Sequence, residues 1–291
     1  MFVKENTISA ARAYFKDRLQ NQFSDSELKS MWKQMICKRF DWSDSEFLLA
    51  AANRLSESDL LYVRSFVKRL QSNEPFQYIL GETTFCDLTI LCDSRALIPR
   101  PETEELVAWI SEQLGVISIV DICSGSGCIA LALKAKFSNA HVVGFDISEE
   151  ANSLARTNAE LNKQAVEFYE VDVLDIKSEF WKNMAGVDVI VSNPPYITDD
   201  EKVQMNQNVL DFEPHLALFV PNNTPIIFYD RISRLAFEKL NQNGFLFFEL
   251  NPDYSAEVIE ILNQIGFINI ELKKDLQGKS RMLKAQKNVI L

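Results

Sequence analysis

The sequence predicts an α/β protein in which a doubly wound, mostly parallel sheet follows a small helical bundle. From Glu104 onward, short apolar runs rich in β-branched residues alternate with helical patterns, an order typical of parallel βαβ units. Before Pro75, helix starts recur without intervening strands. With 291 residues and 47% apolar content, the chain can bury two cores. We therefore expect a helical domain over residues 1–75, a linker over 76–100 and the α/β domain over 101–291.

The N-terminal part contains three capping-box sequences, in which Ser is followed three residues later by Glu or Asp. They begin at Ser24, Ser43 and Ser56, and each precedes a segment with helical apolar spacing. An earlier helix is predicted over Ile8–Leu19, so four or five short helices make up the bundle. Two apolar faces are expected to form its core rather than a docking surface. These faces are Leu48, Leu49 and Ala52, and Leu60, Val63, Val67 and Leu70.

The linker is expected to begin with a short helix and to continue as a hairpin. The helix covers residues 76–80 and is ended by Gly81, while residues 83–85 and 88–91 have the pattern of two short strands. This segment leads to Arg100. For Arg100, a structural ion pair and a direct role in the functional site are both open.

The first strand of the α/β domain, residues 117–122, leads into a loop with two glycines and then into a buried helix. The loop residues are Cys123, Ser124, Gly125, Ser126 and Gly127. Such a turn lets a ligand approach the backbone closely and points a helix N-terminus at it. Asp146 ends the next strand, where an acidic side chain can bind both hydroxyls of a ribose. Together these features predict a site for a nucleoside.

The loop does not have the dinucleotide pattern, because Ala130 stands where a third glycine would be required. Alanine is sometimes allowed there, so NAD is disfavoured without being excluded. A third strand, residues 166–171, ends at Asp172, which could either accept from an adenine amino group or cap a turn. The helices of this domain are expected near 103–114, 128–137, 149–162, 225–242 and 254–265.

The most informative segment follows a β-branched strand at 187–192 and reads Asn193-Pro194-Pro195-Tyr196. A residue before proline is held extended and proline fixes its own φ, so this turn is stiff. Because prolines have no N–H, the Asn193 side-chain oxygen and the Pro194 carbonyl are acceptors with few competing donors. Two acceptors suit one NH₂ group, and Tyr196 can lie flat against the planar group that carries it. The alternative is a proline-rich turn that simply ends a strand.

Taken together, the glycine loop, Asp146, Asp172 and the Asn-Pro-Pro-Tyr turn resemble the class I S-adenosylmethionine-dependent methyltransferases that modify amino nitrogens. Within that group the sequence is similar to the PrmC/HemK family, the N5-glutamine methyltransferases of peptide chain release factors. Further segments carry the resemblance through all but the N-terminal part of the chain. They are Leu97–Glu104, Glu213–Leu218, Gly244–Glu249 and Asp275–Arg281.

The resemblance implies a seven-stranded sheet that ends in an antiparallel hairpin over 267–273 and 280–287. It also implies S-adenosylmethionine as the cofactor, S-adenosylhomocysteine as its product, and a class 1 release factor as the partner, which the helical bundle helps to recognise. The acceptor would be the glutamine of the release factor's Gly-Gly-Gln loop. The cofactor-binding residues would be Cys123, Ser124, Gly125, Ser126, Gly127, Asp146, Asp172, Val173 and Asn193. The catalytic residues would be Asn193, Pro194 and Tyr196, and the substrate-binding residues Asn193, Pro194, Pro195 and Tyr196.

The sequence departs from the family pattern at two places. Cys123 stands where the family usually has glycine. A cysteine does not readily take a positive φ, so we expect it to adopt an ordinary backbone angle and to line the methionine end of the cofactor. Pro221-Asn222-Asn223 replaces a common Asp-Gly turn, which affects only a surface loop.

Composition fits a soluble enzyme, and we expect a cytosolic monomer that contacts neither a membrane nor duplex DNA. No uninterrupted apolar run approaches the length of a membrane span, and charged residues interrupt any signal sequence near the N-terminus. The five cysteines are odd in number and form no C-x-x-C pair, and only two histidines are present. Neither a disulfide framework nor a metal site is therefore expected.

The charge distribution bears on the substrate. Residues 1–75 contain twelve Lys and Arg against ten Asp and Glu, which gives a net charge of +2. Since the whole chain has a net charge of −11, the net charge of residues 76–291 is −13. Binding of duplex DNA needs cationic side chains against phosphates, so a protein with a basic surface is a better substrate for this acidic part of the chain than duplex DNA is. Acidic surfaces also serve solubility. Three alternatives are kept: an adenine-N6 nucleic-acid methyltransferase, a ribosomal-protein glutamine methyltransferase and a cofactor-binding scaffold without catalysis.

Overall fold

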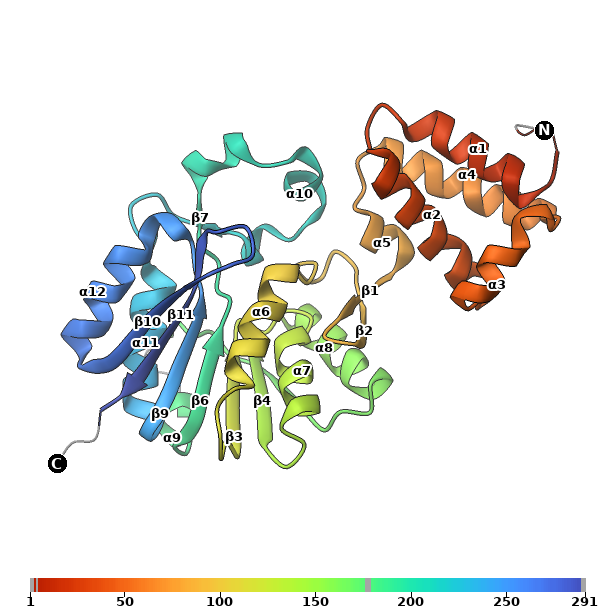
Figure 1. Cartoon of the computed structure of the whole chain (residues 1–291). Helices are drawn as coiled ribbons and strands as arrows, with labels where there is room; N and C mark the ends of the chain where they lie inside the picture. The colour runs from red at the N-terminus through yellow and green to blue at the C-terminus, as the bar shows by residue number, and fades with distance from the viewer. Residues whose placement is uncertain (1–2, 4, 176–178, 289–291) are drawn as a thin grey trace. The chain divides into compact units, whose positions relative to one another are not determined.

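The computed structural model describes residues 3, 5–175 and 179–288, and the chain forms two compact units (Figure 1). One unit comprises Met1–Gly81 together with Gln207–Phe212, and the other comprises Glu82–Asn206 together with Glu213–Leu291. The division in the N-terminal part of the chain falls directly after the short helix of the linker.

The N-terminal unit is a bundle of short helices. They are α1 (Ile8–Leu19), α2 (Asp25–Phe40), α3 (Asp44–Leu49), the 3-10 turn η1 (Ala50–Ala52), α4 (Glu57–Gln71) and α5 (Phe76–Leu80). The fully buried rings of Phe15, Trp32 and Phe66 lie in its core. The four residues of α4 predicted for the core, from Leu60 to Leu70, are all buried there. The predicted helix starts and the α4 face are thus confirmed.

All three predicted capping boxes form in full. At the start of α2, the Ser24 hydroxyl accepts from the Glu27 N–H at 3.3 Å, and the Glu27 carboxylate accepts from the Ser24 N–H at 2.7 Å. The same reciprocal pair occurs at Ser43 and at Ser56. The Glu27 carboxylate also accepts from the Ser24 hydroxyl at 2.6 Å, and this bond, followed by the one from the Ser24 N–H, lowers the pKa of Glu27. Each helix therefore begins where its own sequence satisfies the first N–H groups.

The prediction for the other apolar face is wrong. Leu48 and Leu49 are 78% and 85% exposed, Ala52 is exposed as well, and Ala50 is the residue buried in the core. The physical reason is that the short α3 packs Phe47 against the core and the following 3-10 turn buries Ala50, so Leu48 and Leu49 face away from the core. A 3-10 turn has 3.0 residues per turn rather than 3.6, so helical spacing does not carry through it.

The second unit contains a seven-stranded sheet with the order β10-β11-β9-β6-β3-β4-β5. Its strands are β3 (Ser118–Ile122), β4 (His141–Asp146), β5 (Glu167–Glu170), β6 (Val187–Ser192), β9 (Leu240–Glu249), β10 (Phe267–Lys274) and β11 (Ser280–Lys287). Strands β5, β4, β3, β6 and β9 are parallel, whereas β11 is antiparallel to both β9 and β10. The doubly wound sheet and its final antiparallel hairpin are as predicted.

Helices cover both faces of this sheet (Figure 1). One face packs against α6 (Pro101–Ile110), α7 (Cys128–Lys136) and α8 (Glu149–Leu161), and the other against α11 (Ile227–Lys239) and α12 (Ser255–Ile265). Successive residues of a strand alternate between the two cores: Ile119 of β3 faces the first and Val120 the second. The short α9 (Glu179–Asn183) also contributes Trp181 to the second core.

The linker forms a hairpin of β1 (Glu82–Phe85) and β2 (Leu88–Leu91). Both residues of its tight loop, Cys86 and Asp87, have positive φ values of 46° and 65°. A two-residue loop of this kind matches the right-handed twist of the strands, so two residues are enough to connect β1 and β2.

Short elements complete the chain. They are β7 (Ile197–Thr198), η2 (Asp199–Gln204), α10 (Gln207–Phe212), η3 (His215–Ala217), β8 (Phe219–Val220) and η4 (Pro252–Tyr254). Within the described part of the chain, no helix combines the length and the apolar character needed to cross a membrane. No cluster of three or more potential metal ligands occurs among the same residues.

Replacement of Ser24 by Ala should lower the free energy of unfolding by about 1 kcal/mol, because the N–H of Glu27 loses its acceptor. The urea midpoint, followed by circular dichroism, measures this loss. Ser30→Ala is the control, since Ser30 is exposed within the same helix and alanine favours helix. An equal loss in both variants would contradict the capping assignment.

Candidate active site

The register of the sheet brings distant parts of the chain into one row at its carboxyl edge. Ser192 of β6 pairs with Ile122 of β3 on one side and with Phe248 of β9 on the other, and β4 is in step with β3. The residues that come next along these strands form a row across the sheet, in the order Glu249, Asn193, Cys123 and Asp146. Ligands of doubly wound sheets bind at this edge.

A pocket lies at this edge and brings most of the predicted site residues together. They are Cys123, Ser124, Gly125, Ser126, Asp146, Asp172, Val173, Asn193 and Pro195. Three predicted residues do not belong to its lining: Gly127, Pro194 and Tyr196. Residues 95–100 of the linker form another part of the wall.

The two glycines of the loop have different tasks. Gly125 has a φ of +53° and open space where a Cβ would lie, since the nearest atom, the Ala96 Cβ, is 4.0 Å away. At Gly127 a Cβ would lie 2.7 Å from the ring of Phe168, so this glycine permits close packing of the loop on β5. Next to Gly125, the buried Ser124 hydroxyl has no hydrogen-bond partner among the described residues. The loop thus presents polar groups to the pocket.

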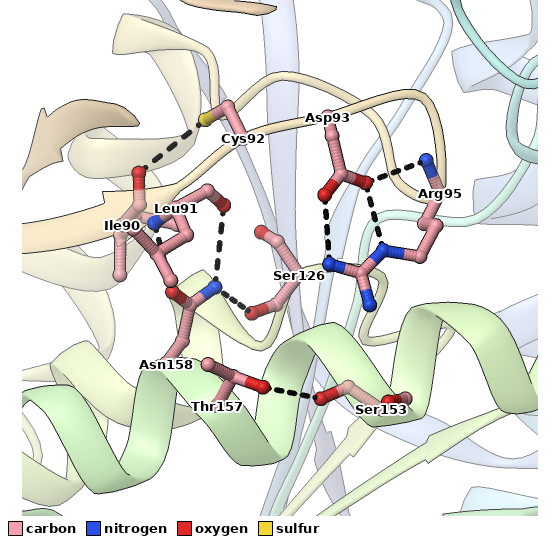
Figure 2. A network of polar contacts seen from close by, with 9 residues as sticks. All are labelled: Ile90, Leu91, Cys92, Asp93, Arg95, Ser126, Ser153, Thr157 and Asn158. Atoms are coloured by element: carbon pink, nitrogen blue, oxygen red, sulfur yellow. Dashed lines mark hydrogen bonds and ion pairs between the residues drawn. The ribbon is translucent and has the colours of Figure 1, made fainter. Parts of the chain in front are cut away.

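Asn158 of α8 holds this loop against the linker hairpin (Figure 2). Its side-chain Nδ2 donates to the Ser126 carbonyl at 3.0 Å, and its Oδ1 accepts from the Leu91 N–H at 2.8 Å. Asn158 is fully buried. Sequence analysis did not identify it, although an asparagine between Ala155 and Ala159 on a buried helix face was an available signal.

Asp146 supports the loop as well as facing the pocket. Its Oδ2 accepts from the Gly125 N–H at 2.8 Å and its Oδ1 from the Ser148 N–H at 2.9 Å. Burial raises the pKa of Asp146, against the backbone hydrogen bonds, which lower it. The position is the one predicted for a carboxylate that binds a ribose.

Asp172 has the structural role that was kept as its alternative, because its Oδ1 caps a turn by accepting from the Leu174 N–H at 2.8 Å. It also lines the pocket, together with Val173. One carboxylate oxygen is sufficient for the cap, so the two roles of Asp172 are compatible.

The expectation for the backbone of Cys123 is wrong, because its φ is +62°. The reason lies in the neighbouring residues: the Ser124 N–H donates to the Phe145 carbonyl and the Gly125 N–H to Asp146. These bonds hold the loop in the shape that glycine usually provides, at a cost of roughly 1 to 2 kcal/mol for a residue with a Cβ. The side chain lines the pocket, and burial raises the pKa of the thiol well above its usual value.

Arg100 forms a partly buried ion pair with Glu213, whose side chain is almost fully buried; Nη2 and Oε1 are 2.6 Å apart. The other carboxylate oxygen of Glu213 accepts from the Ile98 N–H at 3.1 Å. The segments Leu97–Glu104 and Glu213–Leu218, which both carry the family resemblance in the sequence, therefore meet in one contact. Arg100 also lines the pocket, so the ion pair fixes one of its walls.

Two solved structures show the same fold at low sequence identity. They are a methyltransferase from Pyrococcus furiosus (TM-score 0.50, 20% identity, 69% of this chain and 90% of that one) and the delta-N METTL16 methyltransferase domain (TM-score 0.51, 17% identity, 69% and 89%). The sheet order, the glycine loop and the pocket at the carboxyl edge define the class I methyltransferase fold.

Family models and full-length relatives define the particular family. Residues 10–81 match the PrmC N-terminal domain and residues 102–212 the methyltransferase small domain. A release factor glutamine methyltransferase from Flavobacterium psychrophilum is 39% identical, covering 94% of this chain and 96% of its own length, and one from Bacteroides thetaiotaomicron is 38% identical, covering 94% and 98%. The chain belongs to the release factor glutamine methyltransferase family, which confirms the resemblance drawn from its motifs.

The strain at Cys123 can be measured with a matched pair of variants. Both Cys123→Gly and Cys123→Ala remove the thiol, but only glycine adopts a φ of +62° without strain. We expect the glycine variant to be the more stable by roughly 1 kcal/mol in thermal or urea unfolding. An alanine variant at least as stable as the glycine variant would contradict the positive φ.

Proposed function

We propose that this protein transfers a methyl group from S-adenosylmethionine to the side-chain amide nitrogen (N5) of the glutamine in the Gly-Gly-Gln loop of class 1 peptide chain release factors. The observation that carries the proposal is the position of Asn193 in the same pocket as the glycine loop and Asp146. The relatives that are similar over nearly the whole chain bear the name of this activity.

The pocket residues fit the proposed cofactor. Asp146 offers a carboxylate for the ribose hydroxyls, and the Ser124 hydroxyl needs a partner. Ile147, Val173 and Phe228 supply apolar walls suited to an adenine ring. When bound, S-adenosylmethionine supplies an electrophilic methyl group on a sulfonium.

The acceptor presents a chemical difficulty that the Asn-Pro-Pro-Tyr turn answers. An amide nitrogen shares its lone pair with the carbonyl and is a poor nucleophile, so position must compensate. The Asn193 side-chain oxygen and the Pro194 carbonyl would accept the two N–H bonds of the glutamine amide. They orient its nitrogen and stabilise the positive charge that develops on it. No residue of the turn is an evident base, and none is needed before transfer: the nitrogen that has accepted the methyl group carries a positive charge and both of its hydrogens, and this cation is acidic enough to lose one proton to water.

The roles of Pro195 and Tyr196 are more structural in this proposal. Pro195 lines the pocket beside Asn193. Tyr196 is half-buried against the second core of the sheet, where burial raises the pKa of its hydroxyl. It remains a candidate to pack against the substrate's planar amide, and it acts as a neutral ring rather than as a base.

The substrate is tested by methyl transfer from labelled S-adenosylmethionine to four acceptors in parallel. These are a purified class 1 release factor, the same factor with the glutamine of its Gly-Gly-Gln loop replaced, intact ribosomes and duplex DNA. We expect label on the intact release factor alone. Label on ribosomes or DNA would instead support one of the two alternative acceptors, and binding of cofactor without transfer to any acceptor would indicate a scaffold.

Asp146→Asn should weaken S-adenosylmethionine binding by about tenfold or more, because an amide cannot accept from both the Gly125 and the Ser148 N–H as well as from a ribose. Isothermal titration calorimetry measures the affinity. Glu260→Gln, the same chemical change at an exposed position of α12, is the control. Unchanged affinity in the Asp146 variant would remove Asp146 from the cofactor site.

Asn193→Ala should reduce kcat by about a hundredfold or more, because the acceptor amide loses one of its two positioning bonds. Cofactor affinity should change by less than about threefold, since Asn193 acts mainly on the acceptor. Turnover on the release factor and cofactor titration give the two values. Near-normal turnover would overturn the role assigned to Asn193.

A further inference from the structure

The side-chain amide of Asn158 binds two segments of the chain at the same time (Figure 2). Its Nδ2 donates to the Ser126 carbonyl of the glycine loop at 3.0 Å, and its Oδ1 accepts from the N–H of Leu91, the last residue of β2, at 2.8 Å. The same Nδ2 lies 3.4 Å from the Leu91 carbonyl, so both main-chain polar groups of Leu91 contact this one side chain. Asn158 therefore bridges the glycine loop and the linker hairpin.

These hydrogen bonds are made out of contact with solvent. Asn158 is fully buried on α8, and Ala155 and Ala159 of the same helix are buried in the first core of the sheet. If a buried amide loses a partner, no water replaces it, and the free energy of desolvation is not recovered. The amide of Asn158 therefore favours one arrangement, in which Leu91 and Ser126 are held at a fixed separation.

The residues after Leu91 carry this restraint to the pocket. Residues 95–100, which we call the linker wall, line the pocket, whereas Leu91 does not belong to the lining. Between them the Asp93 carboxylate accepts from the Arg95 N–H at 3.0 Å, from its Nε at 2.9 Å and from its Nη2 at 2.7 Å (Figure 2). The Ala96 N–H donates to the Asp93 carbonyl at 3.3 Å. This turn is bonded within itself, so a restraint on Leu91 also restrains the linker wall.

The linker wall and the glycine loop approach each other at the pocket. A Cβ at Gly125 would lie 4.0 Å from the Ala96 Cβ. Ser126, whose carbonyl accepts from Asn158, follows Gly125 directly, and both residues line the pocket. From the other direction Asp146 accepts from the Gly125 N–H at 2.8 Å. Asp146 and Asn158 thus hold adjacent residues of the loop, and Asn158 holds the linker as well.

We infer that Asn158 is a positioning residue for the cofactor, which couples the glycine loop to the linker wall and holds both in place before S-adenosylmethionine binds. Walls that are already ordered lose less conformational freedom on binding, so the affinity is higher. The coupling is reciprocal, since a ligand that orders the glycine loop also orders Leu91 through the shared amide. The inference rests on the proposed function, from which it takes the cofactor.

The test compares Asn158→Leu with the matched control Asn162→Leu. Leucine has the branching of asparagine but neither donates nor accepts hydrogen bonds. Asn162, the C-cap of α8, donates to the Thr89 carbonyl of the same hairpin at 2.8 Å. Both variants weaken the attachment of α8 to the hairpin, whereas the Asn158 variant also loses the bond to the glycine loop.

We expect the Kd for S-adenosylmethionine, measured by isothermal titration calorimetry, to rise about tenfold or more in the Asn158 variant. In the Asn162 variant it should rise by less than about threefold. With the release factor as acceptor, the KM for the cofactor should follow the Kd, while kcat at saturating cofactor changes by less than about threefold. A role in the fold alone would lower the melting temperature and leave the Kd of the folded protein unchanged.

A second measurement uses the wild-type protein and follows hydrogen exchange of single N–H groups by NMR. Saturating S-adenosylmethionine should slow exchange of the Leu91 N–H by about tenfold or more beyond any slowing of the Ile117 N–H. The Ile117 N–H is the reference because it too donates to a side chain, the Asp188 carboxylate at 2.9 Å, and it lies at the opposite edge of the sheet.

Each outcome supports or overturns the inference. Wild-type affinity in a folded Asn158 variant would overturn it, and so would equal losses of affinity in the two variants, which would assign the effect to the hairpin alone. If the Asn158 variant does not fold, hydrogen exchange decides: selective slowing at Leu91 supports the coupling, and equal slowing at Leu91 and Ile117 overturns it. A wild-type protein that binds S-adenosylmethionine without methylating the release factor would count against the proposed function alone.

Discussion

The pairing of β6 with β3 on one side and with β9 on the other is the constraint on which the site depends. Parallel strands in step end at one level, so the residues that follow them must lie side by side. This pairing sets Asn193 between Cys123 and Glu249. The glycine loop, the Asn-Pro-Pro-Tyr turn and the late glutamate are separated by many residues in the chain, and they meet because hydrogen bonds of the sheet fix their register.

Buried polar side chains then fix the loops that leave this edge. Asn158 joins the glycine loop to the linker hairpin, Glu213 joins Arg100 to the segment that follows α10, and Glu249 joins the end of β9 to Thr103 of α6. A buried polar group that loses its partner pays the full cost of desolvation, so such contacts tolerate few alternative arrangements. The pocket is therefore shaped by a small number of contacts, each with a specific geometry.

Cys123 shows how firmly the loop geometry is imposed. The backbone adopts the left-handed conformation that suits glycine even though this residue has a Cβ. The next two residues make hydrogen bonds in this shape, to the Phe145 carbonyl and to Asp146, and these bonds offset the local strain. The strained backbone of Cys123 lies at the pocket, where the shape of the backbone determines how closely a ligand can approach.

The sequence by itself determined the features that depend on local chemistry: the capping boxes, the strand and helix pattern, the stiff proline turn and the pocket residues at the strand ends. Each follows from a few adjacent side chains and from the restricted φ of proline and glycine. The tertiary structure decided what depends on distant partners, namely the exposure of Leu48 and Leu49, the positive φ of Cys123, and the contacts of Asn158 and Glu249. Hydrogen bonds and packing between segments far apart in the chain set these features, and no periodicity in a single segment records them.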